Sequence, residues 1–296
     1  MELKHTSARN AVVKESPQDF LDENGITFTP GADSITEEMS PPSASIRSQM
    51  TPVENQGSLG SCTTFCVTAC IEFFYQTDLS EANLNDVAER TYGDCTEGLA
   101  IAHAMQTARN PGVVVESAWP YDENQTCWTY PPDTSAFPKF KFNSIAVLYN
   151  RPTAHIIASM RSAIAGRNSI SLSRSTSPGS VVALIKGVIG NLRQPVALDV
   201  PVWWRSDGHF EAGWEMGPDI HMPTPAHLQN WLARTGSMSP PNVSGWHCIA
   251  ICGYDDRTGR FEFKNSWDTW WGDKGYGTIP YDYVTSYSRT AMHGWL

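Results

Sequence analysis

Residues 56–65 read QGSLGSCTTF, and residues 66–76 continue the chain as CVTACIEFFYQ. Two glycines precede Ser61, whereas no proline or glycine follows it in these two stretches. The mostly apolar run therefore predicts a largely buried helix that begins near Ser61. Cys62 would stand at the N-terminus of this helix, where partial positive charge and unpaired N–H groups favour a thiolate. We therefore expect Cys62 to be a nucleophile of low pKa.

A reactive thiol also needs a base and a group that orients the base. His247 lies in the segment SGWHCIAICGYDD, at the start of a predicted buried strand, and Asn265 lies further along in FKNSWDTWWGDKGYG. Two adjacent strands would bring these side chains together. Gln56 offers an amide N–H that, with the Cys62 N–H, would stabilise an oxyanion. Each feature alone has a structural explanation, and only their combination indicates nucleophilic catalysis.

The combination resembles the papain family of cysteine peptidases over roughly residues 43 to 296. The similarity lies in the nucleophile, histidine and asparagine segments and in an intervening groove region. These segments are TPVENQGSLGSCTTF (51–65), CTEGLAIAHAM (95–105), GVVVESAWPY (112–121), WHCIAICGYDD (246–256) and KNSWDTWWGDKGYG (264–277). The resemblance implies an α+β fold of two lobes with the active-site cleft between them. One lobe would be mainly helical, roughly residues 55–130, and the other β-rich, roughly residues 140–285.

The resemblance also implies roles for single residues. Cys62 would attack the peptide carbonyl to form an acyl-enzyme, and His247 would exchange the proton. Asn265 would orient the imidazole, and Gln56 would help to form the oxyanion hole. A second set would bind the substrate or screen the site: Glu97, Gly98, Leu99, Cys248, Trp267 and Trp271.

Within this second set, some roles are more specific. Trp267 would shield the His247–Asn265 contact from water, and Trp271 would line the leaving-group side. Gly98 would hydrogen-bond the substrate backbone. Glu97 replaces a glycine that is common in the family. Its added carboxylate, together with the acidity of the chain, predicts a preference for basic substrate side chains.

The cysteines depart from the family's pattern. Leu59 and Val87 stand where many members have cysteines, and Cys95 and Cys127 match the usual partners of those positions. The resemblance therefore implies that both disulfides are absent, as in bacterial members, which agrees with a reducing compartment. Trp246, just before the histidine, also departs from the pattern, so specificity is not transferred from any relative.

Residues 1–42 are polar and broken by prolines, so we expect an extended arm or propeptide that inhibits by blocking the cleft. A disordered tail is the alternative. Residues 43–296 would form the peptidase domain. Helices are expected mainly in the first half and strands in the second, which favours an α+β class. The expected helices cover residues 98–109, 153–164 and 181–192, the strands cover 195–202, 248–254, 261–264 and 276–279, and a long loop covers 206–245.

The composition argues against several partners and cofactors. A net charge of −10 without a run of Lys or Arg disfavours nucleic acid and anionic membranes. No apolar stretch reaches the roughly 18 residues that a transmembrane helix needs. The first residues lack a signal-peptide core, so we expect a cytoplasmic protein or one exported without a recognisable signal. No C-x-x-C occurs, so a structural zinc site has little support. We expect no metal and no other cofactor. Three cysteines are interpreted as small buried side chains: Cys66, Cys70 and Cys252.

We expect a cysteine endopeptidase that acts on a peptide or protein substrate, with two alternatives. The same acyl-enzyme could pass its acyl group to an amine, which would make the chain an acyl transferase or peptide ligase. Water exclusion decides between these fates. A non-catalytic homologue would instead keep the groove and only bind peptides. Transfer to an added amine would identify the first alternative, and failure of an epoxide inhibitor to label Cys62 would favour the second.

Overall fold

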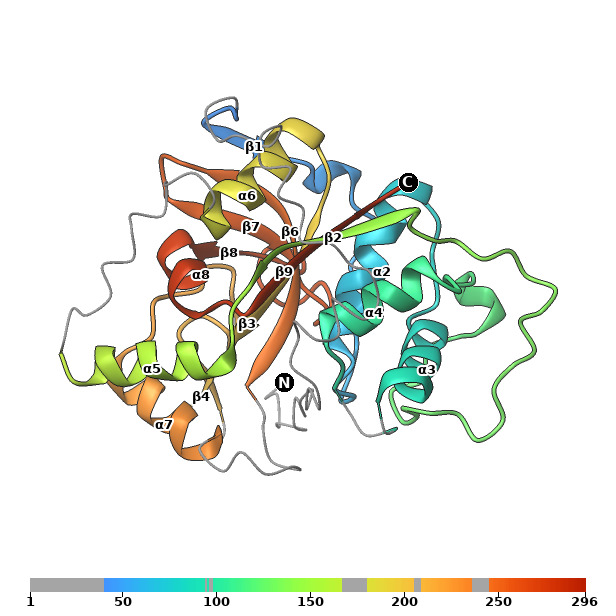
Figure 1. The fold of residues 1–296 in the computed structure, drawn as a ribbon, viewed down its shortest axis with the longest axis horizontal. Helices are drawn as coiled ribbons and strands as arrows, with labels where there is room; N and C mark the ends of the chain where they lie inside the picture. Colours follow the sequence, from blue (N-terminus) through green and yellow to red (C-terminus); the bar gives the residue numbers. More distant parts are fainter. Residues whose placement is uncertain (1–39, 94, 96–97, 167–179, 205–208, 236–244) are drawn as a thin grey trace.

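The computed structural model describes residues 40–93, 95, 98–166, 180–204, 209–235 and 245–296. Two lobes form an α+β fold: helices α2, α3 and α4 gather on one side, and a sheet with the remaining helices forms the other (Figure 1). No helix among the described residues is long and apolar enough to cross a membrane.

The predicted N-terminal arm lies outside the described residues except for its last three. There the chain contacts the β-rich lobe. The Tyr254 hydroxyl donates to the Pro41 carbonyl at 2.7 Å, and the Asp256 N–H donates to the Pro42 carbonyl at 2.9 Å.

The helical lobe consists of α2 (Cys62–Tyr75), α3 (Glu81–Tyr92) and α4 (Ile101–Arg109), followed by a short 3-10 turn, η4 (Glu116–Ala118). The start of α2 confirms the helix predicted from the first segment. α4 begins later than predicted because Gly98 has a φ of +97°, a conformation in which a right-handed helix does not continue.

Helix α3 was not predicted, because its buried face is polar. The Ser80 hydroxyl caps it by accepting the Asn83 N–H at 3.0 Å. The buried residues of α3 include several with polar or charged side chains: Glu81, Asn83, Asn85, Asp86 and Glu89. Because these polar residues interrupt the apolar stripe that marks an amphipathic helix, the sequence does not indicate α3.

The β-rich lobe is organised by a seven-stranded antiparallel sheet of order β2-β9-β3-β6-β7-β8, with β1 paired to β6. The four predicted strands correspond to β3, β6, β7 and β8. A turn closes the β6–β7 hairpin, where the Gly259 N–H donates to the Asp255 carbonyl at 2.9 Å. The strands are β1 (Ser43–Ser45), β2 (Ser144–Asn150), β3 (Val196–Pro201), β6 (Trp246–Asp255), β7 (Arg260–Lys264), β8 (Tyr276–Pro280) and β9 (Thr290–Trp295).

Further helices and a small ribbon complete this lobe. They are η3 (Arg47–Gln49), α5 (Thr153–Ile164), α6 (Val181–Gly187), the π turn η5 (Val188–Leu192), β4 (Trp203–Trp204), β5 (Phe210–Glu211), α7 (Pro225–Thr235) and α8 (Tyr281–Tyr287). The long loop predicted over residues 206–245 is therefore partly wrong, because it contains β5 and α7. Leu228 and Trp231 of α7 are buried in the lobe's core, and this packing stabilises a helix that the local sequence does not reveal.

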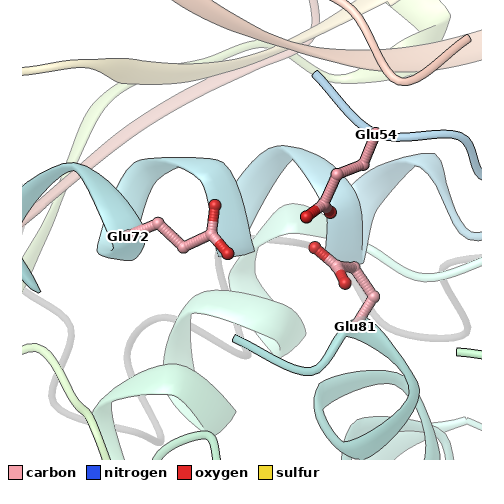
Figure 2. Close-up of side chains that lie close together, drawn as sticks. All are labelled: Glu54, Glu72 and Glu81. Atoms are coloured by element: carbon pink, nitrogen blue, oxygen red, sulfur yellow. The ribbon is translucent and has the colours of Figure 1, made fainter. Parts of the chain in front are cut away.

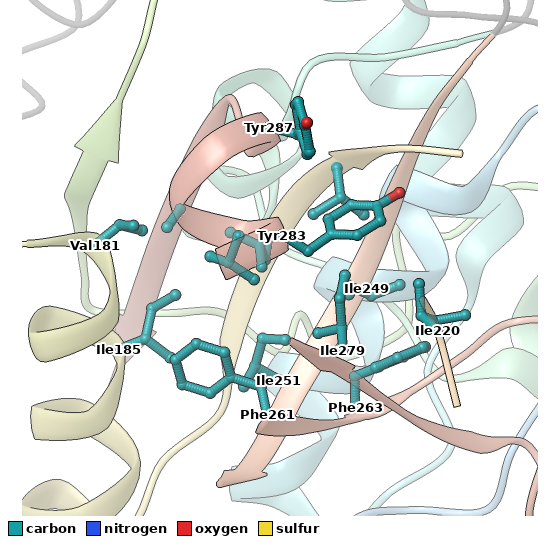
Figure 3. Close-up of a cluster of buried hydrophobic side chains, with 14 of the residues drawn as sticks. Val181, Ile185, Ile220, Ile249, Ile251, Phe261, Phe263, Ile279, Tyr283 and Tyr287 are labelled. Carbon is teal, nitrogen blue, oxygen red and sulfur yellow. The ribbon is translucent and has the colours of Figure 1, made fainter. Parts of the chain in front are cut away.

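The sheet buries both of its faces. Figure 3 shows the first, where Ile185 of α6 and Tyr283 of α8 belong to the same apolar cluster as Ile251 of β6. On the second face α2 packs against β6, which brings the start of α2 to the β-rich lobe. The three cysteines interpreted as small buried side chains are buried: Cys66, Cys70 and Cys252.

The structure contains one disulfide that the sequence analysis did not predict. Cys95 and Cys127, whose usual family partners are replaced by Leu59 and Val87, are bonded to each other. Their Cα atoms are 5.4 Å apart, within the range that a disulfide requires. The two usual disulfides of the family are absent, as expected, but the bond between their orphaned partners was not predicted. The argument for a reducing compartment therefore loses its support.

Candidate active site

Cys62 is the first residue of α2, and its half-buried side chain faces β6. The backbone N–H of Cys248 hydrogen-bonds to its sulfur. Burial, and to a smaller extent the carboxylate of Asp199, raises the pKa of the Cys62 thiol to about 11. The low pKa expected at a helix N-terminus is therefore wrong for this arrangement, because desolvation outweighs the favourable backbone dipoles.

His247 and Asn265 are joined by a hydrogen bond of 2.7 Å between Nε2 and Oδ1. The Ser266 N–H also donates to Asn265 Oδ1 at 2.9 Å, which identifies this atom as the amide oxygen. An oxygen acceptor requires that His247 Nε2 carries the proton. When the ring is neutral, Nδ1 is therefore left with a lone pair and can act as a base.

The ring of His247 is buried, with 2% of its surface exposed. Burial lowers the pKa of His247 to about 4, although the hydrogen bond with Asn265 acts in the opposite direction. The imidazole is therefore neutral at pH 7, the form that a proton acceptor needs.

Two neighbouring strands bring the histidine and the asparagine together, as the sequence suggested. His247 is the second residue of β6, and Asn265 directly follows the paired strand β7. The Asn265 N–H donates to the Gly275 carbonyl at 2.9 Å, which fixes the backbone where the chain leaves the sheet.

Two tryptophans enclose the His247 ring. Trp267 stacks on it with ring centres 4.6 Å apart and an interplanar angle of 28°. Trp214 meets it edge-on at 5.8 Å and is fully buried. Sequence reasoning missed Trp214, because it lies in the segment interpreted as a loop and has no periodic neighbours. Only the packing of that segment onto β6 reveals its place.

Gln56 connects the segments that carry Cys62 and Asn265. Its Nε2 donates to the Leu59 carbonyl at 2.9 Å, and its Oε1 accepts from the Ser266 hydroxyl at 2.6 Å. The backbone N–H of Gln56 also donates to the Ser266 carbonyl at 2.9 Å. A primary amide has two N–H donors. The Leu59 carbonyl accepts from one of them.

The remaining predicted residues fall into three groups. Gly98 is half-buried, and its neighbour Leu99 accepts a hydrogen bond from the Thr63 hydroxyl at 2.7 Å, so the groove segment is tied to α2. Glu97 lies outside the described residues. Leu99, Cys248 and Trp271 are 4%, 3% and 0% exposed, so their side chains offer little area for substrate contact.

Figure 2 shows three carboxylates near this region, from Glu72 in α2, Glu81 at the start of α3 and Glu54 in the preceding segment. Their oxygens lie within 4.8 Å of one another. Such oxygens suit a hard cation, but Lys264 already contributes a positive charge and donates to Thr51, which in turn donates to Glu72. Burial raises the pKa of Glu72 to about 7, and it also raises the pKa values of Glu54 and Glu81. Burial therefore favours the protonated forms of these three carboxyl groups.

Comparisons with known proteins identify the fold and the family of the chain. The solved structure of xylellain, a cysteine protease from Xylella fastidiosa, matches with a TM-score of 0.64 and 16% identity, covering 100% of this chain and 98% of that one. The Amb a 11 cysteine protease of ragweed pollen, solved in its proform, matches with a TM-score of 0.58 and 17% identity, covering 98% and 76%. These similarities show the fold.

Among curated proteins, Peptidase 1 of Euroglyphus maynei is 25% identical over 285 residues, which cover 93% of this chain and 71% of that protein. The chain spans less than two thirds of the length of several other curated relatives that it matches. The family model of the papain family cysteine protease matches residues 40–195, more than half of the 296 residues. The chain therefore belongs to the papain family of cysteine proteases.

Proposed function

We propose that the chain is a cysteine endopeptidase that cleaves peptide bonds through Cys62, His247 and Asn265. The observation that supports this assignment most is the 2.7 Å hydrogen bond between His247 Nε2 and Asn265 Oδ1, which leaves Nδ1 as the proton acceptor. The position of Cys62 on α2, facing the strand that carries His247, supports its role as the nucleophile.

In this proposal the Cys62 sulfur attacks the scissile carbonyl carbon while its proton passes to His247 Nδ1. The resulting oxyanion accepts hydrogen bonds from the Cys62 N–H and from Gln56 Nε2. The C–N bond then breaks, and the Nδ1 proton goes to the leaving amine, which produces a thioester acyl-enzyme. Water gives a proton to Nδ1 and attacks the thioester, and the second collapse releases the acid and returns the proton to sulfur.

Peptides or proteins are the proposed substrates, with residues 1–42 as an internal inhibitor. A preference for basic side chains through Glu97 remains part of the proposal. The cleavage profile of Glu97→Gln tests this preference. A profile identical to that of the wild type would contradict it.

The decisive experiment compares wild type, Cys62→Ala and Cys66→Ala on a peptide library. Cys66 is the matched control, because it is a buried thiol one helical turn further along α2. We expect turnover to fall by at least roughly a thousandfold in Cys62→Ala and to persist in Cys66→Ala. Turnover that survives in Cys62→Ala would refute the assignment.

The same assay separates hydrolysis from acyl transfer. An added amine competes with water for the thioester, so products are analysed by mass with and without it. Hydrolysed products in both conditions support the endopeptidase. Products that carry the amine as the main species would identify the chain as an acyl transferase.

A further inference from the structure

A stack of aromatic rings leads away from His247. The Trp267 ring lies 4.6 Å from the His247 ring at 28°, and the Phe210 ring lies 5.0 Å from the Trp267 ring at 20°. Trp267 therefore makes near-parallel contacts with both rings. Phe210 is half-buried and belongs to β5, in a part of the chain that carries none of the sequence motifs.

The strand that carries Phe210 is fixed from several sides. β5 pairs with β4, and the Glu211 carboxylate lies 2.7 Å from His227 Nε2 on α7. The chain then turns at Gly213, whose φ is +93° and where a Cβ would come within 2.2 Å of a backbone oxygen, so only glycine fits. This turn places Trp214 against the edge of the His247 ring.

We propose that Phe210 is a positioning residue, which holds the Trp267 indole against the imidazole of His247 and keeps water from the His247–Asn265 hydrogen bond. This inference rests on the proposed role of His247 as the base. Phe210 touches Trp267, and its effect on the base passes through that indole. The segment interpreted as a loop thus becomes part of the active-site support.

The inference has two measurable consequences. Without Phe210 the indole loses a stacking partner, so the imidazole is held less well in its reactive orientation, and kcat should fall more than KM rises. Water would also reach the buried ring more easily. Because burial is what lowers the pKa of His247, hydration should move that pKa back toward its ordinary value.

The test uses Phe210→Ala and the conservative Phe210→Tyr in the full chain. We expect kcat/KM to fall about tenfold in Phe210→Ala and the acidic limb of its pH profile to move upward by about one pH unit. Phe210→Tyr should restore both. Phe140→Ala is the matched control, because Phe140 is also half-buried and its ring packs 5.1 Å from that of Tyr75 in the other lobe.

A double-mutant cycle with Trp267→Ala completes the test. If Phe210 acts through the indole, Phe210→Ala should have little further effect in the Trp267→Ala background. The pH titration of the His247 ring, followed by NMR in the Cys62→Ala background, gives a readout that does not need turnover. An unshifted titration, additive effects in the cycle, or a shift shared by Phe140→Ala would each overturn the inference. None of these results would alter the assignment of Cys62, which the library assay decides separately.

Discussion

The sulfur of Cys62 is hydrogen-bonded by the backbone N–H of Cys248, the residue that follows His247. In this position the thiol has a pKa of about 11, so roughly one molecule in ten thousand would be a thiolate at pH 7. A base must therefore remove the proton if Cys62 is to react at neutral pH. His247 precedes Cys248 in the chain and is neutral above a pKa of about 4, and it is the base that we propose for this step.

We predict that alkylation of Cys62 at pH 7 depends on His247. Iodoacetamide should label Cys62 of the wild type faster than the other free cysteines, because those four are buried. In His247→Ala the rate at Cys62 should drop by at least about tenfold, since the imidazole no longer accepts the proton. Peptide mapping of the labelled sites gives both rates. Equal labelling of Cys62 in the two proteins would contradict the role of the imidazole.

The sequence predicted the parts of the fold in which local pattern and tertiary packing agree. Helix α2 combines glycines before Ser61 with a mostly apolar run that lacks proline and glycine. The strand that carries His247 is largely apolar, and the strand that precedes Asn265 alternates Phe261 and Phe263 with charged residues. Helix α3 was not predicted because its buried residues are largely polar. Helix α7 was not predicted because it depends on the packing of Trp231 in the core, which the local sequence does not reveal.

The candidate site shows the same division. Residue types and order select Cys62, His247 and Asn265 as candidates, and the structure joins two of them, His247 and Asn265, by a hydrogen bond. The pKa of Cys62 could not be predicted from its place at a helix start, since burial against β6 dominates it. Trp214 and Phe210 could not be selected either, because their contacts arise only when a distant segment packs onto the site.

The carboxylate cluster should make stability depend on pH. The pKa of Glu72 is raised to about 7 and that of Glu54 is also raised, so the folded state binds protons more tightly than the unfolded state. The resulting stabilisation is complete below the ordinary pKa near 4.5 and is lost as pH rises through about 7. Glu54→Gln should therefore raise the free energy of unfolding at pH 8 by on the order of 1 kcal/mol and have little effect at pH 5.

Urea unfolding at the two pH values measures this difference. The comparison must be made between proteins at the same pH, because buried histidines act in the opposite sense: burial lowers the pKa values of His103 and His293 to about 4. The contribution of these histidines to the free energy of unfolding is lost as pH falls. It is the same in wild type and variant, so it cancels when the two proteins are compared at one pH. Asp282→Asn, at an exposed position in α8, is the control. A Glu54→Gln effect that is equal at both pH values would contradict the prediction.

The Cys95–Cys127 disulfide should stabilise the helical lobe. It closes a loop with a sequence separation of 32, for which restriction of the unfolded chain accounts for up to about 3.7 kcal/mol. We expect the Cys95→Ala/Cys127→Ala double variant to unfold at lower urea concentration than the wild type without reductant. Reductant should lower the urea concentration at which the wild type unfolds and leave that of the double variant unchanged. Equal stability of both oxidised proteins would show that the bond contributes nothing.

Removal of residues 1–39 should raise peptidase activity if the N-terminal arm blocks the cleft. The arm is polar and proline-broken, and an extended chain of that length spans on the order of 100 Å, enough to reach any part of the domain from Pro41. A protein that begins at residue 40 keeps Pro41 and Pro42, whose carbonyls accept hydrogen bonds from Tyr254 and Asp256. The truncated protein should turn over a peptide substrate faster and react faster with an epoxide inhibitor at Cys62, and a synthetic peptide of residues 1–39 should inhibit it. Unchanged turnover and unchanged labelling after deletion would identify the arm as a tail without a regulatory role.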